Sequence, residues 1–262
     1  MSIVYSMSDI HGCIEPLARN MKVVDLSKDE NKLIFCGDYI DYGTDSARAL
    51  YIVYELVNKY PQQVIALMGN HESMILDFLS LPGNDIEAIE WLRADRDFRT
   101  VNTFISTDTL DRVNTIINTS SYSNFYTLFG KIIPLIQNDI TRRHGELINW
   151  LKKLPFYYET DDQIFVHAGI DEEAGEYWKV GTTNECFVSK YPATFGKFHK
   201  DIVAGHISTN TLTDRKDFHD VFWDGKSHFF IDGQTNVSGI IPLLIYDTAS
   251  RSYTTGQGKR IK

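Results

Sequence analysis

The chain has 262 residues, of which 43% are hydrophobic and 23% are charged, and its net charge is −9 at pH 7. This length suits one large α/β domain or one domain with a substantial insertion. The acidic charge argues against a surface for nucleic acid or anionic membrane, and no apolar run approaches the roughly 20 residues that span a bilayer. The first residues show no signal-peptide pattern and the three cysteines have no paired spacing, so we expect a cytoplasmic protein with free thiols.

The first third of the chain alternates short apolar runs with amphipathic segments. Buried strands are predicted at residues 3–5, 32–36 and 64–68. Between and after them, residues 14–24, 46–60 and 71–81 are expected to form helices, the second of which should end at Pro61. Such alternation is typical of an α/β fold.

The pattern changes between residues 85 and 153, where glycines are few and apolar residues recur at helical spacing. We predict a helical cap there, with a loop at the Ser/Thr/Asn-rich residues 118–124. After Pro155, strands are expected again at residues 163–167, 201–206, 227–231 and 241–246. Residues 1–247 would form a single domain that includes the cap, and residues 248–262 a frayed polar tail.

Five of the predicted strands end in short polar strings that contain a glycine. The first three are followed by Ser-Asp-Ile-His-Gly at residues 8–12, Gly-Asp-Tyr-Ile-Asp at 37–41 and Gly-Asn-His-Glu at 69–72. The later pair ends in His-Ala-Gly at 167–169 and Gly-His at 205–206. Glycine lets the backbone turn sharply, and ligands of open α/β sheets bind beyond the carboxyl ends of the strands. We therefore expect these strings to meet around a ligand.

The side chains in these strings are typical metal ligands. Asp9 and His11 are two residues apart, so strand alternation would point both to one side, where they could chelate one ion. The Asp38 carboxylate has two oxygens and could bridge two cations. One amide and two imidazoles complete the set, in Asn70, His167 and His206. This mixture suits Mn²⁺, Fe or Zn²⁺ better than Mg²⁺ or Ca²⁺, and two ions about 3.5–4 Å apart can activate a water for an in-line displacement.

In this order the strings resemble the motifs of the phosphoprotein-phosphatase branch of the calcineurin-like metallophosphoesterases, over residues 3–247. That branch includes bacterial Ser/Thr protein phosphatases and symmetrical diadenosine tetraphosphate hydrolases. The resemblance implies a two-sheet β-sandwich flanked by helices, with two divalent ions in a Mn²⁺ or Fe-containing centre. The first ion would be held by Asp9, His11 and Asp38, and the second by Asp38, Asn70, His167 and His206.

The resemblance also implies that His71 is the general acid that protonates the leaving oxygen and that Asp41 orients it. One position departs from the pattern Gly-Asp-x-x-Asp-Arg-Gly, because Tyr42 stands where the family has a phosphate-binding arginine. A phenol is a single neutral donor, whereas a guanidinium is a bidentate cation. Tyr42 could therefore be a packed aromatic residue or a substrate contact.

A cation from elsewhere could compensate for the missing arginine. Lys179, behind Trp178, stands where relatives often place a second phosphate-binding arginine, although a surface lysine is the commoner case. The arginines of the cap are expected mostly to form a solvated face, with a smaller chance that one reaches the site. They are Arg93, Arg96, Arg99, Arg142 and Arg143.

Three functions remain open at this point. The first, which we favour, is a metal-dependent phosphatase that acts on phosphomonoesters or phosphoproteins. The second is a hydrolase of dinucleoside polyphosphates, in which Trp91 of the cap could stack on a base. The third is a metal-binding regulatory protein with weak catalysis, motivated by Tyr42 but opposed by the intact His71 and Asp41. The expected partner is a phosphorylated substrate, either a protein or a small ester or nucleotide.

Overall fold

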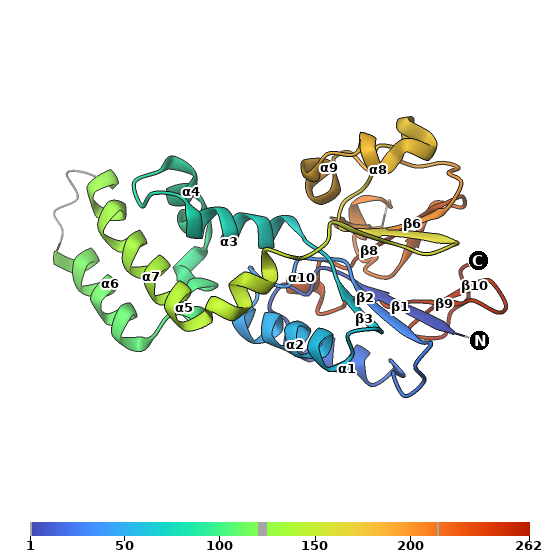
Figure 1. The fold of residues 1–262 in the computed structure, drawn as a ribbon, viewed down its shortest axis with the longest axis horizontal. Helices are drawn as coiled ribbons and strands as arrows, with labels where there is room; N and C mark the ends of the chain where they lie inside the picture. The colour runs from blue at the N-terminus through green and yellow to red at the C-terminus, as the bar shows by residue number, and fades with distance from the viewer. Residues whose placement is uncertain (1, 120–124, 214) are drawn as a thin grey trace.

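The computed structural model of the protein describes residues 2–119, 125–213 and 215–262. Its first sheet has five strands in the order β10-β9-β1-β2-β3 and joins the two ends of the chain (Figure 1). The three strands of the N-terminal part run parallel, whereas β9 pairs antiparallel with β1 and β10 antiparallel with β9. These strands are β1 (Ile3–Met7), β2 (Lys32–Phe35), β3 (Val64–Ala66), β9 (Leu244–Asp247) and β10 (Ser252–Thr255).

The second sheet has the order β4-β5-β6-β8-β7, with three parallel strands between two antiparallel edges. Its strands are β4 (Tyr157–Glu159), β5 (Gln163–Val166), β6 (Asp201–Ser208), β7 (Phe222–Trp223) and β8 (His228–Asp232). Ile34 of the first sheet packs with Phe165 and Val203 of the second in one buried cluster. The two sheets therefore face each other across a shared core, and their parallel strands carry the candidate ligands.

Helices cover the outer face of each sheet (Figure 1). The first sheet is covered by α1 (Ile14–Met21) and α2 (Ser46–Lys59), which place Leu17 and Val53 in the core. The second is covered by η2 (Glu172–Tyr177), α8 (Trp178–Gly181) and α9 (Asn184–Ser189), short elements that the sequence analysis did not assign. The expected α/β fold, a two-sheet sandwich flanked by helices, is confirmed.

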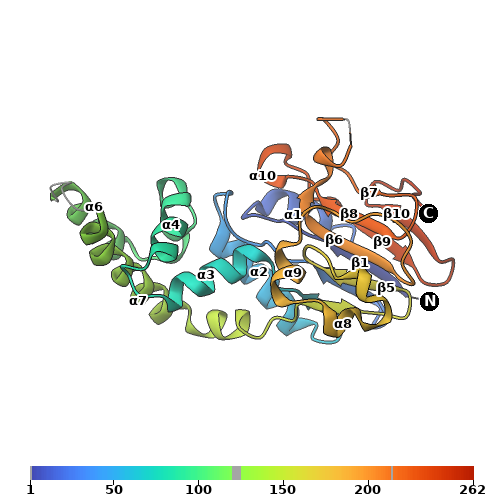
Figure 2. The same cartoon turned by 90° about the horizontal axis from the view of Figure 1, so that it is seen from above.

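The region between the third and fourth ligand strings is helical and projects from one end of the sandwich (Figure 2). Helix α3 (Asn70–Ser80) leads into it from β3 and α7 (Phe125–Leu151) returns from it. Between them lie α4 (Ile86–Ala94), η1 (Arg96–Phe98), α5 (Val101–Phe104) and α6 (Thr107–Thr119). We call residues 86–151 the cap. Of the loop expected at 118–124, the first two residues end α6 and the rest lie outside the described residues.

The C-terminal segment differs from the expectation of a frayed tail at residues 248–262. Strand β10 lies at the edge of the first sheet, where Tyr253 pairs with Tyr246 of β9 and is only 1% exposed. The Tyr253 hydroxyl donates to Asp201 Oδ2 over 2.8 Å, and Lys262 pairs with the same carboxylate at 2.6 Å. The expectation was wrong because it weighed the polar composition and overlooked the anchoring by one buried aromatic residue. No helix in the described part of the chain is long and apolar enough to cross a membrane.

Candidate metal centre and active site

The candidate ligands meet at the carboxyl ends of the parallel strands of both sheets. Asp9 and His11 follow β1, and Asp38 follows β2. Strand alternation is not what aligns Asp9 with His11, as the sequence analysis had assumed, because β1 ends at Met7. The two side chains nevertheless converge, and His11 Nε2 lies 3.7 Å from Asp9 Oδ1. The turn after the strand therefore brings them together.

Left-handed backbone conformations are concentrated in these loops. Such a conformation costs a residue with a Cβ atom roughly 1–2 kcal/mol, and it persists where the surrounding structure enforces it, often at functional sites. Six candidate site residues have a positive φ: Asp9 (55°), His11 (48°), Asp38 (57°), Asp41 (71°), Tyr42 (59°) and His206 (64°). The site residues thus carry much of the turning that the sequence analysis assigned to the neighbouring glycines.

Two of those glycines are required for a different reason, namely the close approach of neighbouring loops. A Cβ atom on Gly69 would collide with the Oδ1 and backbone nitrogen of Asp38. A Cβ atom on Gly205 would collide with Asp9 Oδ2 and Ser8 Oγ. Glycine at both positions therefore allows the loops of the two sheets to come within contact of the ligand carboxylates.

One carboxylate oxygen lies at the centre of the site. Three imidazole Nε2 atoms lie 3.7, 3.8 and 3.4 Å from Asp38 Oδ2, in His11, His71 and His167 respectively. Packing alone is a poor explanation for three imidazole nitrogens around one buried carboxylate oxygen. A shared carboxylate between two sets of ligands is the arrangement that bridging of two cations requires.

The other ring nitrogen of each imidazole is held by an acceptor. His11 Nδ1 donates to the Ile40 carbonyl oxygen and His167 Nδ1 to that of Cys36, each over 2.8 Å. In the neutral ring, this leaves the lone pair on Nε2, which faces Asp38. Metal-binding histidines are usually oriented by such a hydrogen bond, so these rings are arranged to bind cations through Nε2.

A second group of donor atoms lies around Asn70, the first residue of α3. Its Oδ1 atom lies 2.8 Å from His167 Nε2 and 3.2 Å from His206 Nδ1. With neutral rings the amide oxygen faces acceptor nitrogens, and in the opposite orientation the amide nitrogen would donate to both rings and to Asp38. With its oxygen turned towards the two rings, Asn70 completes a set of oxygen and nitrogen donor atoms that fits a cation.

The electrostatics of the site point the same way. Burial lowers the pKa of His11, but the nearby Asp9 carboxylate and the charge of Asp38 outweigh it and raise the pKa to about 10. Burial likewise lowers the pKa of His167, and Asp38 raises it to about 9. The buried carboxylates thus create a strong demand for positive charge, which protons meet when no metal is bound and which divalent ions would meet by displacing them.

His71 and Asp41 form a pair at the edge of this cluster. His71 Nδ1 donates to Asp41 Oδ2 over 2.6 Å, and His71 Nε2 faces the centre of the site. Burial lowers the pKa of His71, but the charge of Asp38 and the hydrogen bond to Asp41 raise it overall. Tyr42, which is 54% exposed, flanks the pair with its ring centroid 5.1 Å from that of His71 and 4.8 Å from that of His11.

The comparison with known families agrees with this geometry. The calcineurin-like phosphoesterase family matches residues 4–228, which is most of the chain. The chain belongs to this family. The expected membership is therefore confirmed, in a family of phosphoesterases that use divalent metals.

Individual relatives of this phosphoesterase match it over a short segment of sequence or at low sequence identity. A symmetrical bis(5'-nucleosyl)-tetraphosphatase of Legionella pneumophila (strain Corby) is 33% identical over 75 residues, or 29% of this chain and 26% of the relative. The match thus spans about a quarter of the length of that curated protein. Among solved structures, a putative diadenosine tetraphosphatase has a TM-score of 0.53 at 15% identity, over 97% of this chain and 92% of the other. A cold-active protein-tyrosine phosphatase of a psychrophilic Shewanella species has a TM-score of 0.55 at 19% identity, over 99% and 79%. These structures show that the fold is shared.

The phosphoesterase supports its ligand loop with a buried glutamate. Glu72 Oε2 accepts the Asp38 backbone N–H and Oε1 accepts that of Tyr39, each over 2.8 Å. Burial and the charge of Asp38 raise the Glu72 pKa to about 7. From its place in the string Gly-Asn-His-Glu, Glu72 is expected to cap its helix or support a loop rather than to bind metal, and these contacts show the loop support.

Asp232 is a buried acidic group that sequence reasoning missed. It follows the predicted strand at 227–231, is 4% exposed and accepts hydrogen bonds from Ser208 Oγ and the Gln234 backbone. Burial and the charge of Asp9 raise its pKa to about 7. The signal was a sixth strand end of the same kind, since Asp232 is followed by Gly233.

A cavity of about 620 Å³ adjoins His71 and Asp41 and lies between the sandwich and the cap. Tyr42 lines it from the sandwich, together with Asn236 of α10 (Thr235–Ser238). The cap contributes Trp91 and the three arginines Arg93, Arg96 and Arg99. Trp91 is only 7% exposed and its ring lies 4.4 Å from that of Phe78, so most of the ring belongs to the cap core, which weakens the idea that it stacks on a base.

Lys179 does not lie at the cavity beside His71. Its ammonium group forms an ion pair with Glu159 on β4 and lies 5.6 Å from the centre of the Trp178 ring. It is not among the described residues that line the cavity beside His71. The structure therefore does not bring Lys179 to the site, whereas it brings three cap arginines there.

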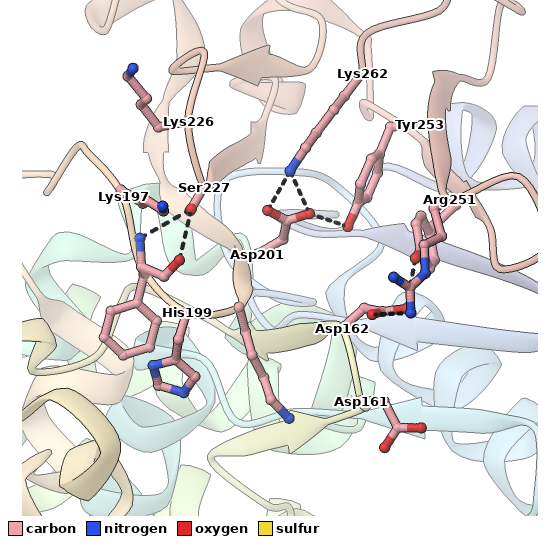
Figure 3. A pocket seen from close by; sticks show the side chains of 13 residues that line it. Asp161, Asp162, Lys197, His199, Asp201, Lys226, Ser227, Arg251, Tyr253 and Lys262 are labelled. Carbon is pink, nitrogen blue, oxygen red and sulfur yellow. Dashed lines mark hydrogen bonds and ion pairs between the residues drawn. The ribbon is translucent and has the colours of Figure 1, made fainter.

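A separate cavity of about 480 Å³ lies at the opposite, amino ends of the strands of the second sheet (Figure 3). Figure 3 shows Asp201 paired with Lys262 and with the Tyr253 hydroxyl, and Arg251 facing Asp162 at 3.5 Å. Lys226 lines the same cavity. Because this cavity carries cationic side chains of its own and is remote from the ligand loops, it offers a control for electrostatic binding.

Proposed function

We propose that this phosphoesterase hydrolyses phosphoric esters with two divalent metal ions that share Asp38. Asp9, His11 and Asp38 would hold the first ion. The second would be held by Asp38, Asn70, His167 and His206. The observation that carries this proposal is the position of Asp38 Oδ2, which lies between imidazole nitrogens from both sheets. Mn²⁺ suits this set of oxygen and nitrogen ligands best, with Fe or Zn²⁺ as alternatives.

When bound, such a pair of ions supplies an activated water and neutralises the oxygens of the reacting phosphate. The chain itself would supply the proton for the leaving group. Asp41 accepts the Nδ1 proton of His71, so the second ring proton is carried by Nε2, on the side that faces the site. Tyr42 makes T-shaped ring contacts with His71 and His11 and would limit how the substrate approaches.

A phosphomonoester or phosphoprotein is the substrate class that we favour on sequence grounds. A dinucleoside polyphosphate is the second candidate, and a specific observation supports it. The cavity beside His71 is of the size that holds small molecules, and guanidinium groups line the wall away from the ligands. The third alternative, a regulatory protein with weak catalysis, is opposed by the 2.6 Å hydrogen bond of His71 to Asp41, which a binding protein would not need.

The cysteines support a reducing compartment for this activity. All three are unpaired, and Cys36 is fully buried in the core between the sheets. Burial raises the pKa of its thiol, so it would stay protonated and inert. We infer that the enzyme works in the cytoplasm, where free thiols persist.

One comparison of substrates tests the proposed function. Purified protein supplied with Mn²⁺ is assayed with p-nitrophenyl phosphate, a phosphopeptide and diadenosine tetraphosphate. We expect hydrolysis of at least one of them, and its loss in Asp38→Asn. Lack of Mn²⁺-dependent hydrolysis of all three substrates would contradict the proposal.

A further inference from the structure

An arginine from another part of the chain contacts the residue that stands where the family has its arginine. Tyr42 replaces the arginine that follows Asp41 in the family motif. The Arg99 side chain, which belongs to the cap, reaches this residue and donates from Nη1 to the Tyr42 carbonyl oxygen over 3.0 Å. A guanidinium has five N–H donors, so this contact fixes the position of Arg99 and leaves other donors for a ligand. The cationic side chain of Arg99 therefore lies beside Tyr42, the position where the family has a cationic arginine.

Arg96 lines the same cavity and is exposed. Within the described parts of the chain, its guanidinium forms no ion pair. Arg93, the third arginine on this wall, pairs with Glu90 over 2.8 Å. Of the three arginines on this wall, Arg96 and Arg99 are thus the two that form no ion pair within the described residues.

The acidic groups that line the cavity are already engaged with other partners. Asp41 accepts the proton of His71 Nδ1. Asp95 accepts the backbone N–H groups of Thr100 over 2.8 Å and Val101 over 3.0 Å. Neither carboxylate forms an ion pair with Arg96 or Arg99 at the distances of this structure. In a chain of net charge −9, this wall is a local concentration of positive charge.

The turn that carries both arginines has an unusual backbone. Asp97 and Phe98, the residues between them, have positive φ values of 57° and 51°. Two consecutive left-handed residues with side chains cost roughly 1–2 kcal/mol each. The hydrogen bonds of Asp95 to the residues after the turn hold this conformation. Strain of this kind, enforced by neighbouring contacts, is typical of functional segments, and here it directs both arginines to the cavity.

We propose that Arg96 and Arg99 bind the phosphate groups of the substrate in place of the arginine that Tyr42 replaces. This inference rests on the proposed function and names its substrate class. Two guanidiniums on the wall opposite the ligand loops suit an anion with a second phosphate beyond the one that reacts, such as a nucleoside polyphosphate. A simple monoester has one phosphate and would use only Arg99.

Binding is measured first, because it does not depend on turnover. The protein is loaded with Mn²⁺, desalted to remove free metal, and titrated by calorimetry with imidodiphosphate, which has a P–N–P bond that resists hydrolysis, and with inorganic phosphate. We expect Arg96→Ala and Arg99→Ala each to weaken imidodiphosphate binding by about 10-fold or more, the usual worth of a charge-assisted contact. Metal content measured after each titration shows that the ions were retained.

Two control variants separate this site from general attraction of anions. Arg112→Ala removes an exposed cap arginine that lies on α6 and 4.0 Å from Asp108. Lys226→Ala removes a cation from the cavity of Figure 3. We expect neither to change imidodiphosphate binding. If Lys226→Ala weakens it while Arg96→Ala and Arg99→Ala do not, the proposal is overturned and the anion binds at the other cavity.

Kinetics on the hydrolysed substrate then identify what each arginine binds. We expect Arg99→Ala to raise KM for p-nitrophenyl phosphate and for a polyphosphate, with a smaller change in kcat, and Arg99→Lys to restore part of the loss. Arg96→Ala should raise KM for the polyphosphate alone. Unchanged KM values for both variants would overturn the proposal. If the wild-type protein hydrolyses nothing yet binds imidodiphosphate through these arginines, the proposed function fails and the binding site remains.

Discussion

Asp38 Oδ2 lies 3.4 Å from His167 Nε2, although Asp38 follows a strand of the first sheet and His167 a strand of the second. The contact crosses the interface of the sandwich, and the Cys36 carbonyl oxygen, two residues before Asp38, accepts the His167 Nδ1 proton. The packing of the two sheets therefore sets the distance between the ligands. This relationship makes Asp38 the residue whose replacement should affect both metal positions.

Asp38→Asn should lower metal content and activity together. The amide keeps one oxygen but loses the negative charge that attracts both cations, and its nitrogen cannot bind them. Elemental analysis of the purified wild-type protein should give up to two Mn, Fe or Zn per chain, and clearly less for the variant. Glu90→Gln, which changes an exposed carboxylate on α4, is the matched control. Full metal content and full rate in Asp38→Asn would rule out the bridging role.

His71→Asn should slow the reaction more for poor leaving groups than for good ones. Acid catalysis is typically worth about 10²–10⁴-fold in rate, and p-nitrophenolate leaves with little need for a proton. The measurement is kcat for p-nitrophenyl phosphate against kcat for an alkyl phosphate. His199→Asn, at a histidine without a place in the site, serves as control. Equal losses with both substrates would indicate a structural role, or direct metal binding by His71, which lies 3.8 Å from Asp38 Oδ2.

Tyr42→Arg should change the reaction little in the wild-type background, because Arg99 already lies beside this position. In Arg99→Ala, by contrast, Tyr42→Arg should restore the lost kcat/KM for p-nitrophenyl phosphate. A large gain, about 10-fold or more, in the single variant would mean that phosphate lacks a cationic partner in the wild type. The two substitutions compared singly and together form a double-mutant cycle that measures their coupling.

Glu72→Gln should destabilise the protein and loosen the ligand loop. Glu72 accepts backbone N–H groups with both carboxylate oxygens, whereas glutamine offers a single acceptor oxygen and would leave one buried N–H group unsatisfied. A loss of this kind costs about 1–3 kcal/mol in the free energy of unfolding. Denaturant unfolding and Mn²⁺ affinity are the measurements. Unchanged stability and affinity would show that the loop keeps its shape without Glu72.

Asp139 should make the stability of the cap depend on pH. Burial alone would raise its pKa, but the Ser106 backbone N–H at 2.7 Å and Arg142 at 2.7 Å hold it well below its usual range. Because the pKa is lower in the folded state, the stabilisation is present above the unfolded value of about 3.9 and is lost as the pH falls below it.

The measurement compares Asp139→Asn with the wild type by urea unfolding at several pH values. The variant should be less stable at pH 7, and the difference should shrink as the pH falls towards 3. Asp108→Asn, at an exposed position on α6, should show no such trend. A difference that is constant with pH would mean that the Asp139 carboxylate is not what stabilises this part of the cap.

The fold class, the family and the donor types of the candidate site could all be predicted from the amino-acid sequence. Apolar runs followed by Asp, His, Asn and Gly locate the strand ends, because a strand must be buried while its end must carry the polar groups. The order of these strings is enough to name the family, which the match over residues 4–228 then showed. Local signals of this kind depend on neighbours in the chain, so they can be read without the fold.

The surroundings of those donors depend on tertiary packing and could not be predicted. The three imidazoles converge on Asp38 because two sheets pack face to face, and Glu72 and Asp232 join the site through contacts that span many residues. The C-terminal segment forms strand β10 instead of a frayed tail because Tyr253 is buried against β9. Arg99 lies 57 residues from Tyr42 in the chain yet contacts its carbonyl oxygen, whereas Lys179, which sequence position favoured, pairs with Glu159 elsewhere. Such pairings depend on how the cap and the sheets pack against each other, and the spacing of residues along the chain does not predict this packing.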